Sequence, residues 1–154
     1  MRRIFIAIAG IGLLTAAATP RVSGAAAKTI MHERHEGMGK IGKVMKMLAR
    51  ELKSGSPDMA VVASNTATMN ALAKKSSLWF PKGSGSEAGK TRALAEIWNK
   101  PEDFAAKMKA FQLASAKLSA AARSSDTAAS TAAFGDLGKS CKACHDPYRS
   151  EDKN

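Results

Sequence analysis

Residues 134–149 read FGDLGKSCKACHDPYR, and the centre of this stretch is the pentapeptide CKACH at positions 141–145. On a helix, positions i, i+3 and i+4 share one face, so the two thiols and the imidazole can meet the same flat ligand. C-x-x-C-H is the spacing of haem c attachment, in which both thiols form thioethers with the haem and the imidazole binds the iron. We therefore predict one covalent haem c, held by Cys141, Cys144 and His145.

Two other kinds of site use the same residue types, and the sequence favours neither. A redox-active dithiol is expected at the start of a helix in a βαβ unit, and no strand pattern precedes the motif. A zinc site needs four ligands, and outside the motif only the remote His32 or His35 could be recruited. Both cysteines of the chain lie in the motif, which also excludes a disulfide-rich scaffold.

The composition suits a small helical domain built around a cofactor. The chain has 154 residues, of which 45% are hydrophobic but only 5% are aromatic, so bulky core residues are scarce. This length is typical of a single domain. Because a haem is larger than any side chain, we expect it to fill space that those few bulky residues leave.

The N-terminus resembles an export signal. Arg2 and Arg3 are followed by an apolar run over residues 4–18, which is too short to span a membrane comfortably. Small residues follow, and cleavage after Ala25 or Ala27 fits the small-x-small rule. We predict a cleaved signal peptide at 1–25, a domain at 26–154 without a membrane span, and a bacterial periplasmic location; the alternative is an uncleaved N-terminal anchor.

Apolar residues recur at steps of three and four, which is the helical period. The first stretch shows the pattern most clearly, with Met31, Met38, Ile41, Met45, Leu48 and Leu52. The helical stretches run from about 27 to 52, 57 to 75, 99 to 122 and 124 to 148. No stretch has the period of two that strands show. We predict an all-α fold, an antiparallel four-helix bundle.

Local signals predict where the later helices begin. Ser56 is the expected N-cap of the second helix, with Pro57 as its first residue. Asn99 and Glu102 have the spacing of a capping box for the third helix. Residues 124–126 contain the expected start of the last helix.

Several segments resemble the cytochrome c-prime family, the class II c-type cytochromes. They are residues 134–149, the segment 96–98 before a helix that opens at 101–104, and the loop 78–84, which resembles low-spin members in particular. The resemblance covers essentially the whole mature chain. It implies a four-helix bundle with covalent haem c near the C-terminal helix.

The resemblance also identifies a candidate distal residue. Family members place it in the first helix, and alignment of residues 30–42 with the low-spin pattern puts Met31 there. A thioether suits haem iron, and Met/His ligation raises the reduction potential. High-spin members usually carry an Arg-Gln pair four and three residues earlier, where this chain has Ala27 and Lys28. The alternative for Met31 is core packing like that of the other methionines.

Other residues are weaker candidates for the pocket. Arg34 could contact a haem propionate, or lie on an exposed helix face. Arg149, one turn after His145, could flank the proximal side of the haem. His35 could replace Met31 as a ligand, although a surface position for both His32 and His35 is the expected one. Trp79 and Phe80 are equally compatible with packing on the haem edge and with closing the end of the bundle.

We therefore expect a periplasmic electron carrier that turns over no substrate and is not an enzyme. The alternative function is a five-coordinate, high-spin haem protein that binds nitric oxide or carbon monoxide. The net charge of +11 is scattered along the helices without an aromatic-interleaved patch, which argues against nucleic-acid binding. Acidic redox partners suit it better, with Lys139 and Lys142 near the attachment site. Because many family members dimerise through their first two helices, a homodimer stays open.

Overall fold

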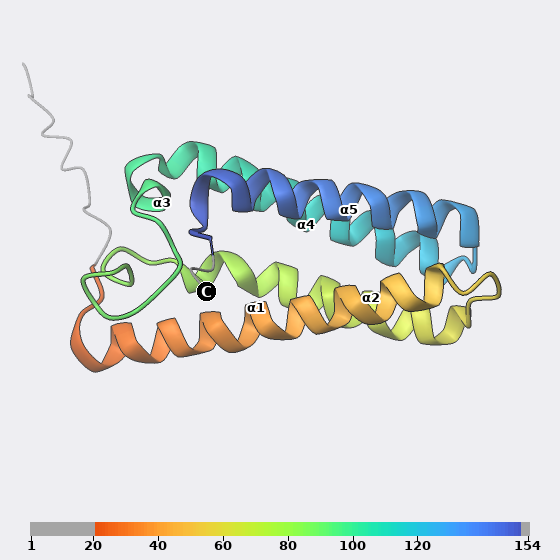
Figure 1. The fold of residues 1–154 in the computed structure, drawn as a ribbon, viewed down its shortest axis with the longest axis horizontal. Coiled ribbons are helices and arrows are strands. Elements are labelled where there is room, and N and C mark those ends of the chain that lie inside the picture. Colours follow the sequence, from red (N-terminus) through yellow and green to blue (C-terminus); the bar gives the residue numbers. More distant parts are fainter. Residues whose placement is uncertain (1–20, 152–154) are drawn as a thin grey trace, which may run out of the picture.

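The computed structural model describes residues 21–151, which form a bundle of long helices (Figure 1). The long helices are α1 (Gly24–Leu52), α2 (Met59–Ser76), α4 (Pro101–Arg123) and α5 (Thr127–Tyr148). The connection between α2 and α4 contains two short segments, η1 (Ser77–Trp79) and α3 (Glu96–Asn99). The described residues contain no β-strand, only one isolated bridge between Ala93 and Arg149. The predicted all-α class is confirmed.

The predicted signal peptide falls largely on residues 1–20, which lie outside the described part of the chain. α1 already begins at Gly24, so a cut after Ala25 or Ala27 would fall within its first turn. Cleavage therefore stays a prediction. Among the described residues, none of the helices has the length and apolar character that a membrane crossing needs.

The second helix begins later than the sequence predicts. Its N-cap is Asp58, whose Oδ1 accepts hydrogen bonds from the backbone N–H groups of Ala60 (2.9 Å) and Val61 (3.2 Å). The first N–H groups of a helix lack partners within it, and a carboxylate in this position satisfies two of them. The predictions of Ser56 as cap and Pro57 as first helical residue are therefore wrong.

The predicted capping box of Asn99 and Glu102 is also wrong. Asn99 is the last residue of α3, and Lys100 takes the cap position of α4 with φ −125° and ψ 60°. A residue that precedes proline avoids the helical region for steric reasons, so Pro101 causes the break at Lys100. The last helix starts as predicted, with Asp126 as its N-cap.

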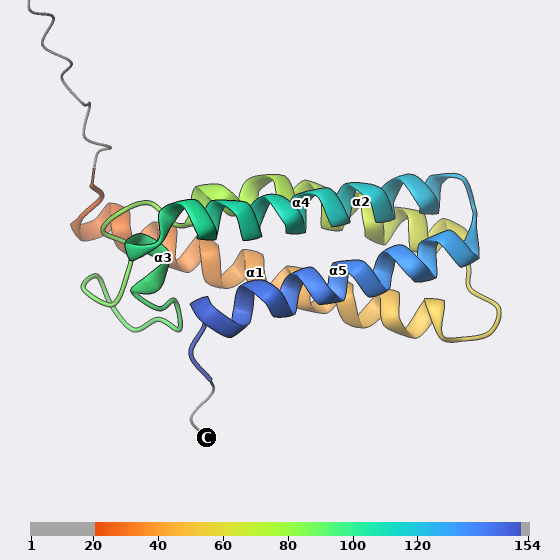
Figure 2. The same ribbon diagram turned by 90° about the horizontal axis from the view of Figure 1, so that it is seen from above.

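The long helices form two antiparallel pairs, α1 with α2 and α4 with α5 (Figures 1 and 2). α4 packs extensively on both α5 and α2, and α1 packs on α2, whereas α1 and α5 make few contacts. The predicted antiparallel four-helix bundle is confirmed. Of the neighbouring helix pairs in the bundle, α1 and α5 pack least closely against each other.

The core separates Met31 from most of the other methionines of the bundle. Met69 and Met108 are buried in the core, and Met38, Met45 and Met59 pack against it, as expected of flexible core filler. Met31 is half-buried and stands outside this cluster. Its thioether is therefore not committed to the protein core. The other members of the predicted stripe, Ile41, Leu48 and Leu52, are buried.

Candidate functional site

The CKACH motif occupies the last two turns of α5, so its three functional side chains share one helix as predicted. Cys141 and Cys144 are free thiols, half-buried and packed against the core. His145 is exposed. The motif is remote from the start of the helix, where a redox-active dithiol is expected.

The thiols also differ electrostatically from those of a redox enzyme. Burial raises the pKa of Cys141. Burial, followed by the neighbouring Cys141, raises the pKa of Cys144 to about 11, against a smaller opposing effect of Lys107. Catalytic dithiols need a lowered thiol pKa. The structure therefore gives the thiol oxidoreductase alternative no support.

The surroundings of His145 favour the neutral form of its imidazole. Desolvation by the surrounding side chains is the largest effect, and the positive charges of Arg149 and Arg92 add to it, so that the pKa of His145 is lowered. A neutral imidazole offers a nitrogen lone pair to a metal. Arg149 thus lies near His145, as the sequence predicts, and its contact with a cofactor stays a prediction.

The chain just before α3 is bound to the end of α5. The N–H of Leu94 donates to the carbonyl of Tyr148 (3.1 Å), and the N–H of Ser150 donates to the carbonyl of Arg92 (2.9 Å). Arg149 is the C-cap of α5, and its N–H donates to the carbonyl of His145 (3.0 Å). This pairing brings Arg92 from the connection to the site on α5.

Tyr148 links α5 to the start of α4. Its hydroxyl donates to Oδ2 of Asp103 (2.5 Å), and its ring meets that of Phe104 edge to face, with 5.2 Å between centroids. The hydrogen bond to Asp103 is the main cause that raises the pKa of Tyr148 to about 12. One turn from His145, this contact fixes the end of the helix that carries the motif.

Tyr148 is the only tyrosine of the chain, so its titration can be followed directly. We expect tyrosinate absorbance to appear with a midpoint near pH 12, above the ordinary value of 10.0. A raised pKa means that the folded state holds the proton more tightly than the unfolded state. The contact therefore stabilises the fold below about pH 10, and this contribution is lost as the pH rises toward 12. Asp103→Asn should move the midpoint toward 10; an unchanged midpoint would show that the carboxylate is not its cause.

Met31 lies on α1 against the connection between α2 and α4. A Cβ atom placed on Gly89 would stand 3.4 Å from Cε and 3.8 Å from Sδ of Met31, which is ordinary van der Waals distance. His32 and His35 are both exposed, as the sequence predicts. A role of His35 as an alternative ligand stays a prediction without a contact that favours it.

Arg34 has different surroundings from those predicted. It is buried, with 6% of its surface exposed, so the prediction of an exposed helix face is wrong. Nη1 donates to the carbonyl of Trp79 (3.1 Å) and Oγ of Ser84 (3.2 Å), and Nη2 donates to the carbonyl of Ser84 (2.8 Å) and Oγ1 of Thr91 (3.1 Å). These four bonds use four of its five N–H donors, and contact of Arg34 with a haem propionate stays a prediction.

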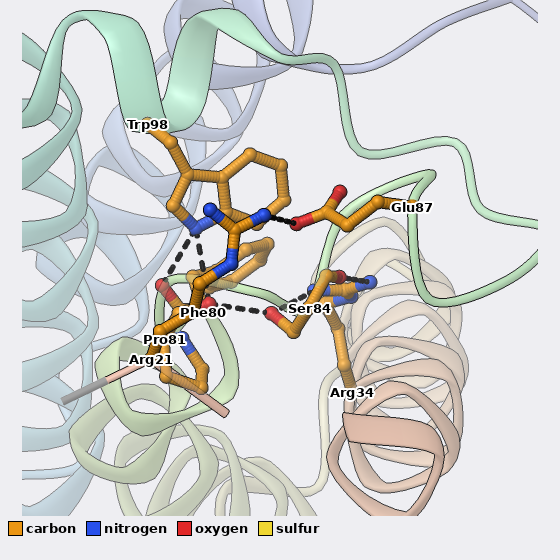
Figure 3. A network of polar contacts seen from close by, with 7 residues as sticks. All are labelled: Arg21, Arg34, Phe80, Pro81, Ser84, Glu87 and Trp98. Carbon is orange, nitrogen blue, oxygen red and sulfur yellow. Dashed lines mark hydrogen bonds and ion pairs between the residues drawn. The ribbon is translucent and has the colours of Figure 1, made fainter. Parts of the chain in front are cut away.

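The aromatic residues of the connection close the end of the bundle. Trp79 is buried against Gly37 of α1. The ring of Phe80 lies 4.9 Å from that of Phe104 and 5.1 Å below the guanidinium of Arg34. The indole N–H of Trp98 donates to the carbonyls of Phe80 and Pro81, both at 3.1 Å, as Figure 3 shows. Of the two predicted roles for Trp79 and Phe80, closure of the bundle end has contacts in the structure.

The residues fit a covalent haem better than a bare metal ion. Residues 21–151 contain no group of three or more His, Cys, Asp or Glu side chains that could hold a metal, so the zinc alternative has no support. Two unpaired thiols and an imidazole whose pKa is lowered by burial stand on one helix instead. Half-buried apolar surface on α1 and few contacts between α1 and α5 suit a large flat group.

Comparisons with known proteins agree with this site. The sequence model described as Cytochrome C' matches residues 29–149. The chain is 41% identical over 119 residues to cytochrome c-554 of Cereibacter sphaeroides, covering 71% of this chain and 77% of that one. It is 41% identical over 120 residues to cytochrome c-556 of Agrobacterium tumefaciens, covering 76% and 94%.

Solved structures give the same result. Cytochrome c prime from Shewanella frigidimarina superposes with a TM-score of 0.77 at 36% identity, over 84% of this chain and 100% of that one. A ferrous variant of cytochrome c prime from Alcaligenes xylosoxidans with bound NO superposes with a TM-score of 0.76 at 30% identity, with the same coverage. Family proteins are bacterial and carry one covalently attached haem c. The chain thus belongs to the cytochrome c' family of haem c proteins.

Proposed function

We propose that this chain is a periplasmic electron carrier whose single haem c is attached through Cys141 and Cys144, with His145 and Met31 as axial ligands. The observation that carries the proposal is the position of Met31. Its thioether stands outside the core in which five other methionines are buried or packed, and it faces Gly89, where an added Cβ atom would meet it at van der Waals distance. The same connection pairs with the end of α5 a few residues later, beside His145.

The bound haem c would supply a one-electron couple between ferric and ferrous iron, with a potential raised by Met/His ligation. The residues of the chain would hold it at both faces and shield it. Ligation at both faces keeps the iron geometry nearly the same in the two oxidation states, which suits fast electron transfer. Substrate turnover has no part in this function, so we propose no enzymatic activity.

Periplasmic location and an acidic redox partner belong to the same proposal. Family proteins are typically periplasmic, and the chain carries a net charge of +11. The two lysines near the attachment site are paired, Lys139 with Asp136 (3.0 Å) and Lys142 with Asp146 (2.8 Å), all of them exposed. Attraction of an acidic partner would therefore come from the whole surface charge rather than from these two lysines.

A second candidate function is the binding of nitric oxide or carbon monoxide at a five-coordinate iron. The observation that favours it is the relative from Alcaligenes xylosoxidans, which is solved with bound NO. The half-exposed Met31 would then cover the distal side without binding the iron. The two candidates differ in a single property, the occupancy of the sixth coordination position.

The absorption spectrum of the reduced protein tests this difference. We expect a sharp low-spin α band that carbon monoxide leaves unchanged at moderate concentration, because the Met31 thioether would occupy the sixth position. A broad high-spin spectrum that carbon monoxide changes would refute the electron-carrier proposal in favour of gas binding. Absence of covalent haem after denaturing electrophoresis would refute both.

A further inference from the structure

A buried guanidinium of α1 joins several points of the loop of residues 79–91. Arg34 contacts both ends of the loop, the carbonyl of Trp79 (3.1 Å) and Oγ1 of Thr91 (3.1 Å), and it contacts Ser84 between them (2.8 and 3.2 Å). Figure 3 shows this guanidinium beside Ser84, with Phe80 close by. A single side chain of α1 thus connects the two ends and the middle of the loop.

The four oxygen partners of Arg34 in the loop are all uncharged. Burial lowers the pKa of the guanidinium from its ordinary value, although arginine remains charged in proteins. A buried charge is tolerated only when hydrogen bonds replace its hydration. The loop and Arg34 therefore stabilise each other, and loss of one oxygen partner leaves a buried donor unsatisfied.

Met31 lies directly next to this attachment. It precedes Arg34 by three residues in α1, so the two side chains share one face of the helix. Gly89 precedes Thr91 by two residues, and it lies so near Met31 that a Cβ atom added to it would touch the end of the Met31 side chain. The hydrogen bond from Arg34 to Thr91 therefore holds the part of the loop that restrains Met31.

We propose that Arg34 is a positioning residue for Met31, which acts by holding the loop of residues 79–91 over the thioether. This inference rests on the proposed function, in which Met31 is the sixth ligand. A methionine side chain has three rotatable bonds and loses their freedom when it binds a metal. A loop held close to Met31 at Gly89 would remove part of that freedom in advance, which would favour Met31 over an external ligand such as carbon monoxide.

A matched pair of substitutions at Thr91 tests the inference in the full holoprotein. Oγ1 of Thr91 accepts from Arg34 and from the backbone N–H of Ala93 (3.1 Å). Thr91→Val keeps the shape and removes both bonds, whereas Thr91→Ser keeps the oxygen. We expect Thr91→Val to tighten carbon monoxide binding about tenfold, the change that corresponds to one lost hydrogen bond to a charged group. Thr91→Ser should behave as wild type.

Oxidation of Met31 gives a second readout, which can be measured whether or not Met31 binds the iron. Peroxide converts exposed methionine to its sulfoxide, which peptide mass spectrometry measures at each position. We expect faster oxidation of Met31 in Thr91→Val, with the rate at the exposed Met47 unchanged. If the wild-type protein proved to be high-spin, the proposed function would fail, and the oxidation rates would still show whether the loop covers Met31.

Val62→Ala separates positioning from general loss of stability. Val62 is fully buried near the start of α2, at the other end of the bundle from the loop. This variant should lower the melting temperature without changing carbon monoxide affinity or Met31 oxidation. Equal changes in Val62→Ala and Thr91→Val, or wild-type behaviour of Thr91→Val in both readouts, would overturn the inference.

Discussion

Met31→Ala is expected to convert a low-spin protein to a five-coordinate, high-spin one. Alanine has no donor atom, and the neighbours of Met31 on α1 that could replace it, His32 and His35, are exposed. The reduced α band should broaden, carbon monoxide should bind readily, and the reduction potential should fall because the Met/His ligand pair is lost. Absorption spectra and a redox titration of the purified holoprotein measure all three effects.

Met38→Ala is the matched control, because Met38 is also a half-buried methionine of α1 but packs against the core. Its removal should destabilise the fold by roughly 1–3 kcal/mol, at or below the lower part of the range for a fully buried methionine, and leave the spectrum unchanged. If Met31→Ala keeps the wild-type spectrum, Met31 is not the ligand. His35→Ala in the Met31→Ala background would then be the next variant to measure.

The sequence predicted the parts of this protein that depend on local periodicity and spacing. The apolar stripe of α1 recurs at each helical turn, and the C-x-x-C-H motif of α5 lies within about two turns. Both can therefore be recognised without knowledge of the tertiary structure. The start of α5 at Asp126 was predictable for the same reason. The two wrong helix starts show a limit of local signals. At the start of α2, Asp58 takes the N-cap position in place of Ser56. At the start of α4, Pro101 shifts the N-cap position from Asn99 to Lys100.

The surroundings of Arg34 could not be predicted in this way. Its hydrogen-bond partners lie 45 to 57 residues further along the chain, and each of them is an uncharged oxygen of the connection. An arginine in a helical stripe normally indicates an exposed position or a carboxylate partner. The loop residues Ser84, Gly89 and Thr91 carry no motif, so their link to Met31 depends on the fold.

The close approach of Trp79 to Gly37 likewise could not be predicted from the sequence. Gly37→Ala is expected to destabilise the protein despite the higher helix propensity of alanine. A Cβ atom on Gly37 would stand 2.2, 2.5 and 2.8 Å from three ring atoms of Trp79, all of them overlapping. The ring is buried, and the carbonyl of Trp79 is bound by Arg34. The indole therefore cannot move aside cheaply. We expect a loss of about 1–3 kcal/mol in the free energy of unfolding, the usual range for overpacking.

Gly39→Ala is the control for helix propensity, since nothing lies within 4 Å of the Cβ that it would add. This substitution in the same helix should stabilise the protein by about 0.5–1 kcal/mol, so the two variants should differ in sign. Denaturant unfolding of the holoproteins measures both. A double variant, Gly37→Ala with Trp79→Phe, should recover part of the loss because the smaller ring leaves room for the methyl group. If Gly37→Ala matches Gly39→Ala, then Trp79 does not pack against α1 as the structure shows.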